Sequence, residues 1–172
     1  MKSQTVHFTN TQGLKLAGKL DLPLDKKPNN FAIFAHCFTC GKDLKAHRNI
    51  AVGLKQAGIA VLRFDFTGLG QSEGDFADSH FSSNVEDLES AARFLEKNYQ
   101  APTLLIGHSL GGTAVLMAAP KIPSVKAVVT IGAPCEPQHV LNLISEDIET
   151  IESNGEATVT LAGRAFKIKR EF

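Results

Sequence analysis

One serine of the sequence has neighbours and spacing that suit nucleophilic chemistry. Ser109 is the central residue of a Gly-x-Ser-x-Gly motif over 107–111. The apolar segment 103–106 precedes the motif as a strand, and the small residues 110–119 follow it as a helix, which is the context of a nucleophile elbow. Such a turn needs residues without side chains, because backbone segments pack closely around it. The motif therefore predicts Ser109 as a nucleophile at the tip of a tight turn that Gly107 and Gly111 make possible.

Apolar segments typical of strands alternate along the chain with amphipathic segments typical of helices. This alternation predicts the α/β class, with a mostly parallel sheet covered by helices on both faces. Segments 4–8 and 14–22 precede it and predict an N-terminal antiparallel hairpin. Asp43 is expected to cap the first helix, and Ser83-x-x-Glu86 to form a capping box for the second. The core strands are expected at 31–35, 59–64, 103–106 and 125–131, and the helices at 43–57, 83–98 and 110–119.

Two more segments follow predicted strands, as Ser109 does. His36-Cys37-Phe38 comes after the strand at 31–35, and a glycine-rich segment, 65–72, follows the next strand. With the serine motif, they make residues 14–134 resemble the α/β-hydrolases, although Cys37 and Thr67 stand where that family usually has Gly and Arg. The resemblance implies an oxyanion hole built from the backbone N–H groups of Phe38 and Leu110, with His36, Gly107, His108 and Gly111 supporting the loop and the turn.

The resemblance also implies a reaction and a set of partners. Ser109 would attack an ester, thioester or amide carbonyl and form an acyl-enzyme that water hydrolyses. No cofactor and no metal is implied. The His-Cys-Phe-Thr-Cys segment at 36–40, with a predicted hairpin over 158–168, is similar to a bacterial subgroup fused to a C-terminal OsmC-like domain. That domain is therefore an expected partner.

The acid and base of a serine triad have no good candidates after Ser109. In the family, an acid and then a histidine follow the last core strands. Here His139 is the single later histidine and precedes Asp147, the single later aspartate. The sequence therefore predicts a truncated hydrolase with very weak esterase activity, whose core occupies 1–134 and whose cap begins in 135–172. Other acidic residues in this region include Glu136 and Glu146.

Alternative interpretations remain open. Cys37-x-x-Cys40 between a strand and a helix is typical of thiol redox pairs, and His36 and His47 would complete a four-ligand metal set. The glycines of 68–74 have the wrong spacing for a dinucleotide site. A further alternative is a non-catalytic interaction module, in which the acidic 146–156 segment and a basic cluster contact a partner domain. That cluster comprises Arg164, Lys167, Lys169 and Arg170.

Composition narrows the function classes. The 172 residues suit one domain, and the 18 basic and 18 acidic side chains give no net charge to attract nucleic acid. No apolar run approaches the roughly 18 residues that span a bilayer, and no signal peptide is visible at the N-terminus. Three cysteines do not form a disulfide scaffold. A cytoplasmic protein that binds neither membrane nor nucleic acid is expected.

Overall fold

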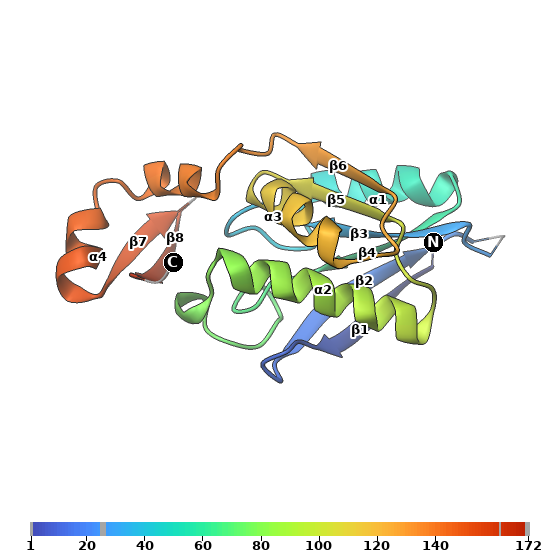
Figure 1. Cartoon of the computed structure of the whole chain (residues 1–172), viewed down its shortest axis with the longest axis horizontal. Helices are drawn as coiled ribbons and strands as arrows, with labels where there is room; N and C mark the ends of the chain where they lie inside the picture. Colours follow the sequence, from blue (N-terminus) through green and yellow to red (C-terminus); the bar gives the residue numbers. More distant parts are fainter. Residues whose placement is uncertain (1, 25–26, 162, 171–172) are drawn as a thin grey trace.

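A six-stranded sheet forms the centre of the computed structural model, which describes residues 2–24, 27–161 and 163–170 (Figure 1). Its spatial order is β1-β2-β4-β3-β5-β6. The first two strands form the expected antiparallel hairpin, and β2 also pairs antiparallel with β4. The remaining pairs, β3 with β4, β3 with β5 and β5 with β6, are parallel. The strands are β1 Lys2–Thr9, β2 Lys15–Leu22, β3 Asn30–Ala35, β4 Ile59–Phe64, β5 Leu104–His108 and β6 Ala127–Ile131.

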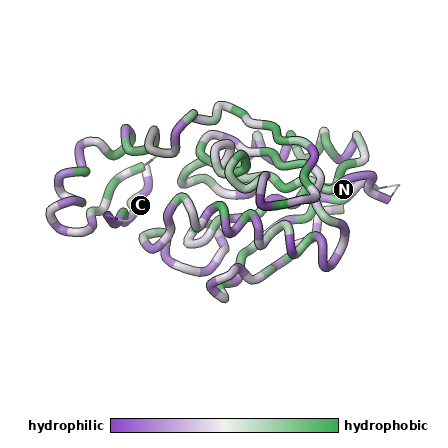
Figure 2. Tube along the Cα trace, in the orientation of Figure 1, coloured by the Kyte–Doolittle hydropathy of each residue, from purple (hydrophilic) through white to green (hydrophobic). Residues whose placement is uncertain are grey.

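Helices cover both faces of this sheet, as predicted. Alternation of side chains along each strand sends one set of apolar residues to each face. One face packs on α1 (Lys45–Gln56) through a small cluster that includes Phe34 and Ala51, whereas the other packs on α2 (Phe81–Asn98) and α3 (Leu110–Ala118). Figure 2 shows the most hydrophobic stretches concentrated in the central strands and α3. The central parallel strands β3, β4 and β5 are thus buried on both sides, which explains their continuous apolar sequences.

Two helix starts differ from the sequence prediction. Leu44, not Asp43, is the N-cap of α1, because the Asp43 carboxylate instead lies 3.2 Å from Lys19 Nζ and 3.5 Å from an Arg63 nitrogen. Helix α2 begins at Phe81, two residues before the predicted cap. His80 is its N-cap, and Ser83 is the third helical residue of a reciprocal capping box. In both cases, side-chain contacts that the local sequence pattern did not reveal determine where the helix begins.

The chain after β6 forms a separate small layer beyond the carboxyl-terminal edge of the sheet, drawn orange to red in Figure 1. It contains the 3₁₀ helix η3 (Pro137–Leu143), the short helix α4 (Ile148–Asn154) and the predicted hairpin of β7 (Glu156–Leu161) and β8 (Arg164–Lys169). The hairpin rests on the 3₁₀ helix η1 (Phe76–Asp78) through a Phe76–Phe166 ring contact at 5.1 Å. Another 3₁₀ turn, η2 (Ala119–Lys121), follows α3. No helix in the described ranges is long and apolar enough to cross a bilayer.

Candidate active site

Ser109 occupies a strained turn between β5 and α3. Its backbone has φ 53° and ψ −126°, and among the described residues only Thr39 shares a positive φ without being glycine. A non-glycine residue there costs on the order of 1–3 kcal/mol and persists only when its surroundings hold it. The Ser109 N–H donates to the Ile131 carbonyl at 2.9 Å, and the Ser109 carbonyl accepts from Gly112 at 2.7 Å. The turn is therefore fixed from both sides.

The glycines around Ser109 are required by close backbone contacts. A Cβ on Gly107 would lie 2.2 Å from the Gly111 carbonyl oxygen, and one on Gly111 would lie 2.3 Å from the His36 carbonyl oxygen. Real Cβ atoms do not approach other atoms this closely. Gly111 thus lets the first turn of α3 approach the end of β3, where the loop carrying Phe38 begins.

Two cavities lie next to these elements. Ser109 lines an open cleft of about 690 Å³ together with residues that follow β6. Phe38 and Leu110 line a second, much smaller cavity of about 10 Å³, which is close to the least volume that holds one water molecule. The structure therefore brings Phe38 and Leu110 to one cavity and Ser109 to the neighbouring cleft. The other described residues of the cleft are Gly132, Ala133, Pro134, Cys135, Glu136 and Asn142.

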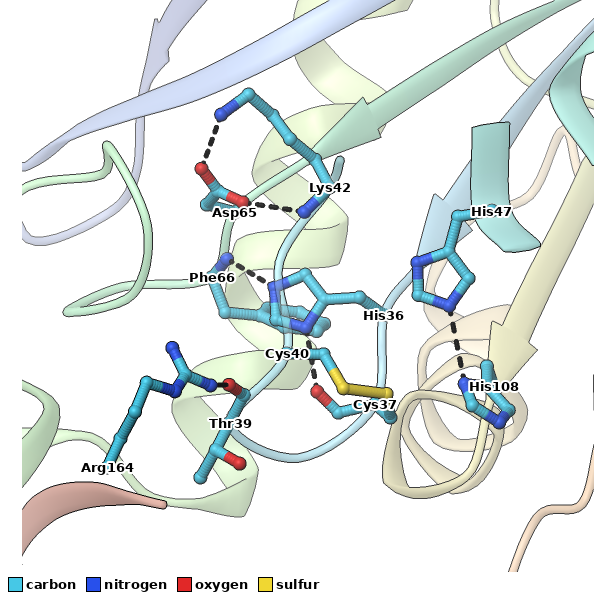
Figure 3. Close-up of a disulfide and its surroundings, with 10 residues drawn as sticks. All are labelled: His36, Cys37, Thr39, Cys40, Lys42, His47, Asp65, Phe66, His108 and Arg164. Carbon is cyan, nitrogen blue, oxygen red and sulfur yellow. Dashed lines mark hydrogen bonds and ion pairs between the residues drawn. A yellow bond between two sulfur atoms is a disulfide. The ribbon is translucent and has the colours of Figure 1, made fainter. Parts of the chain in front are cut away.

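His36 holds the loop between β3 and α1, which we call the 36–44 loop. The ring is 1% exposed, and its two nitrogens have different partners: Nδ1 lies 2.8 Å from the Cys37 carbonyl oxygen, and Nε2 accepts from the Phe66 N–H at 3.2 Å (Figure 3). Nδ1 must therefore carry the proton of a neutral ring. Burial lowers the pKa of His36, which also favours the neutral form. His36 is thus a positioning residue whose nitrogens are both engaged.

The far end of the 36–44 loop is anchored by a buried ion pair. Lys42 Nζ lies 2.5 Å from Asp65 Oδ2, and the Lys42 N–H donates to Asp65 Oδ1 at 2.7 Å (Figure 3). Gly70 lies directly against this carboxylate, where a Cβ would come within 2.3 Å of it. This contact explains why residue 70 is a glycine. The sequence excludes a dinucleotide site here and offers no other role for Gly70.

Cysteine and histidine side chains gather on the other side of the 36–44 loop. Cys37 and Cys40 form a disulfide, the pairing that the Cys-x-x-Cys spacing offered as an alternative interpretation. His47 Nε2 lies 3.3 Å from His108 Nδ1, and Cys37 is the third member of this group (Figure 3). The sequence hypothesis of a set with His36 is corrected, because both His36 nitrogens point to other partners. Burial, followed by the charges of His108 and His36, lowers the pKa of His47 to about 4.

Comparison with known proteins places these features in one family. The family described as "Serine aminopeptidase, S33" matches residues 32–165, which include the 36–44 loop, the Ser109 turn and β7. The chain belongs to this family of α/β-hydrolases. Its open parallel sheet and the position of Ser109 after β5 agree with that assignment.

Relatives of this α/β-hydrolase include several esterases and thioesterases. The esterase domain of a Rhodothermus marinus protein is 48% identical, with a TM-score of 0.72, and the match covers all of this chain and 66% of that one. The thiohydrolase apmlB of Arthrinium phaeospermum is 34% identical over 75% of this chain and 42% of its own length. Rat monoglyceride lipase is 34% identical over 49% of this chain and 27% of its own. The chain thus spans less than half the length of each of these two curated relatives.

The residues considered for the triad are scattered in this α/β-hydrolase. Asp147 is the N-cap of α4, Glu146 is exposed, and Glu136 lines the cleft that Ser109 lines. His139 lies in η3, but its side chain is outside the described part of the structure. Within the described part, no histidine is hydrogen-bonded to the Ser109 hydroxyl. Sequence reasoning missed Lys42, which belongs to no motif and acts through the distant Asp65. It named His47 as a possible metal ligand but did not foresee its contact with His108.

Proposed function

We propose that this chain carries the nucleophilic half of a serine esterase or thioesterase, with Ser109 as the nucleophile. The observation that carries the proposal is the strained backbone of Ser109, which precedes α3 and lines an open cleft. Backbone strain of this kind costs free energy and persists only where the surrounding structure holds it, and it clusters at functional sites. The names of the relatives add the class of substrate: a lipase, an esterase and a thiohydrolase all act on acyl groups bound to oxygen or sulfur.

In the proposed reaction, Ser109 Oγ attacks the acyl carbonyl and the alcohol or thiol leaves with a proton. Water then hydrolyses the acyl-enzyme and restores the serine. The backbone N–H groups of Phe38 and Leu110 would stabilise the negative oxygen of each tetrahedral intermediate. Two features support this role: Phe38 and Leu110 line one small cavity, and Leu110 is the first residue of α3, a position whose N–H has no acceptor within the helix.

The general base and acid are proposed to lie outside the described side chains. Strand β6 is the edge of the sheet, and Val129 and Ile131 are 45% and 37% exposed. Leu116 and Met117 on the adjacent α3 are also exposed. An apolar sheet edge is suited to receive further strands, and in the family the acid and the histidine follow such strands. Residues 135–172 would then form the start of a cap over the Ser109 cleft.

A fluorophosphonate probe and p-nitrophenyl esters test the proposal. The chain should react with the probe slowly at Ser109 and hydrolyse the ester very weakly, because loss of a triad base lowers rates by about 10⁴–10⁶-fold. Ser109→Ala should abolish labelling, whereas Ser153→Ala, an exposed serine on α4, should not change it. A longer version containing further strands should react much faster.

Labelling that stays absent in the longer version would support the non-catalytic interaction module instead. Robust turnover by the 172-residue chain, abolished in Ser109→Ala, would show that the base lies within it and would make His139 the first residue to test.

The proposal also includes a cellular location and a partner domain for this chain. The low cysteine content favours the cytoplasm, where Cys37 and Cys40 would exist chiefly as thiols. An OsmC-like domain remains the proposed C-terminal partner, on the likeness of the segment at 36–40 and the later hairpin. Co-expression of this chain with such a domain, followed by a pull-down, tests that contact.

A further inference from the structure

Three elements bring a cysteine and two histidines to one point. Cys37 comes from the 36–44 loop, His47 from α1 and His108 from the end of β5, so the parallel order β3-β5 places them together. One ligand atom of each lies within 4.8 Å of the other two. Figure 3 shows a nitrogen of the His47 ring directed toward a nitrogen of the His108 ring, and the two ring planes meet at 72°. No step of the proposed hydrolysis uses this cluster.

The spacing of the two ring nitrogens suits a tetrahedral metal ion. Nitrogens bound about 2.0–2.1 Å from zinc in tetrahedral geometry are about 3.3 Å apart. His47 Nε2 and His108 Nδ1 are 3.3 Å apart. Thiolate and imidazole are the ligands that zinc prefers. The nitrogens are thus already placed for coordination, and Cys37 supplies the sulfur.

The remaining nitrogen of His47 fits a ligating histidine. Nδ1 is buried and has no hydrogen bond of normal geometry to the described residues, although the Gly41 backbone lies close enough to influence the ring. Ligating histidines usually direct the nitrogen not bound to metal toward a backbone carbonyl or carboxylate. With a metal on Nε2, Nδ1 would carry the proton and point toward Gly41. Coordination would therefore give both ring nitrogens a role.

We propose that reduced Cys37, His47 and His108 bind one zinc-like divalent cation, with the fourth position open to solvent. In the structure the Cys37 sulfur is bonded to Cys40 and is not available as a thiolate. A dithiol reductant would break this bond by taking up the disulfide form itself and leaving two thiols. Cys37 would then lose its proton to solvent as its sulfur binds the cation. The proposal of this site does not depend on the proposed hydrolysis.

The metal would join two segments that matter for catalysis. Cys37 directly precedes Phe38, and His108 directly precedes Ser109. An ion bound to both would connect the 36–44 loop to the serine turn through α1. The disulfide, in contrast, links two residues of the same loop. Reduction followed by metal binding would therefore replace the disulfide within the loop by coordination bonds that join three elements.

Titration of the full chain with cobalt(II) and zinc(II) tests the site. The protein is reduced with a phosphine, which leaves no competing thiol. Cobalt should produce the charge-transfer and visible bands of a tetrahedral, thiolate-bound ion at one equivalent. Zinc should displace it in competition with a chromophoric chelator. The oxidised protein should produce none of these bands.

Two cysteine variants show whether Cys37 is a metal ligand or whether binding only requires a reduced protein. Cys37→Ser should lose binding by more than about 100-fold, since even outer-shell partners of a metal contribute about 10–100-fold. Cys40→Ser should bind cobalt with or without reductant, because Cys37 then has no partner in the loop. Cys135→Ser is the matched control: its free, exposed thiol is not part of the cluster, and binding should not change.

Histidine variants complete the test. His47→Gln and His108→Gln should each weaken binding by more than about 100-fold, with circular dichroism confirming that both remain folded. The proposal is overturned if the reduced chain shows no thiolate bands, or if Cys40→Ser loses binding as Cys37→Ser does. Unchanged binding in folded His47→Gln and His108→Gln would overturn it as well.

Discussion

Lys42 and Asp65 form a buried ion pair that joins the chain after β3 to the chain after β4. Their side chains are 3% and 2% exposed, and Lys42 Nζ lies 2.5 Å from Asp65 Oδ2. The same carboxylate accepts the Lys42 and Gln71 backbone N–H groups at 2.7 Å and 3.0 Å. The Asp65 carboxylate therefore holds both the 36–44 loop and the segment after β4 at the carboxyl edge of the sheet.

Removal of the Lys42 cation should strongly destabilise the fold. Lys42→Met leaves the Asp65 carboxylate buried without its counterion, and losing one partner of a buried pair costs about 3–5 kcal/mol. The free energy of unfolding, measured with urea, reports this loss. Lys19→Met is the control, because its pair with Asp43 is about 40% exposed and exposed pairs contribute about 0–1 kcal/mol. Similar losses in both variants would contradict the role given to Lys42.

Two glycine-to-alanine changes should act in opposite directions. Gly111→Ala places a Cβ against the His36 carbonyl and should destabilise the protein by about 1–3 kcal/mol, as overpacking does. It should also slow fluorophosphonate labelling, because the start of α3 must shift. Gly53→Ala lies within α1, where a Cβ meets nothing within 4 Å. It should stabilise the fold by about 0.5–1 kcal/mol. Thermal unfolding of both variants measures the contrast; an equal effect would refute it.

Stability should fall as the pH is lowered from 7 toward 4. Burial lowers the pKa of both His36 and His47, the latter from 6.5 to about 4. Between these values the unfolded chain binds more protons than the folded one, so acid favours unfolding. The His47 contribution is fully present above 6.5. Its loss by pH 4 is at most about 3 kcal/mol, since one pKa unit corresponds to about 1.4 kcal/mol.

Urea unfolding across this pH range, with a chelator present, checks the expectation. His47→Gln should flatten the pH dependence, because the substituted side chain does not titrate. His7→Gln changes an exposed histidine of β1 and serves as the control. A parent chain whose stability does not change from pH 7 to 5 would contradict the expectation.

Local sequence patterns predicted the strands, most of the helices and the serine turn, since their signals lie within a few neighbouring residues. Gly107 and Gly111 could be assigned to close contacts because the turn itself demands them. The cluster of Cys37, His47 and His108 could not be predicted in this way. His36 is next to Cys37 in sequence, yet strand pairing brings His108 to the cysteine and the loop turns His36 toward Phe66.

An arginine of the β7–β8 hairpin is hydrogen-bonded to the 36–44 loop. The Arg164 guanidinium donates to the Thr39 carbonyl, and Thr39 has a positive φ of 56° (Figure 3). Arg164→Met should release this carbonyl and let the loop move more freely. Hydrogen exchange of the peptide covering 36–44 should therefore accelerate, while the central strands remain protected.

Two further variants show whether the contact with Thr39 is responsible. Lys167→Met removes a cation from the same strand whose partner is Glu156, within the hairpin, and should leave exchange of the 36–44 loop unchanged. Arg164→Lys keeps a donor of similar reach and should restore part of the protection. If exchange rises equally in Arg164→Met and Lys167→Met, the hairpin is loosened as a whole, and Arg164 has no specific hold on the loop that carries Phe38.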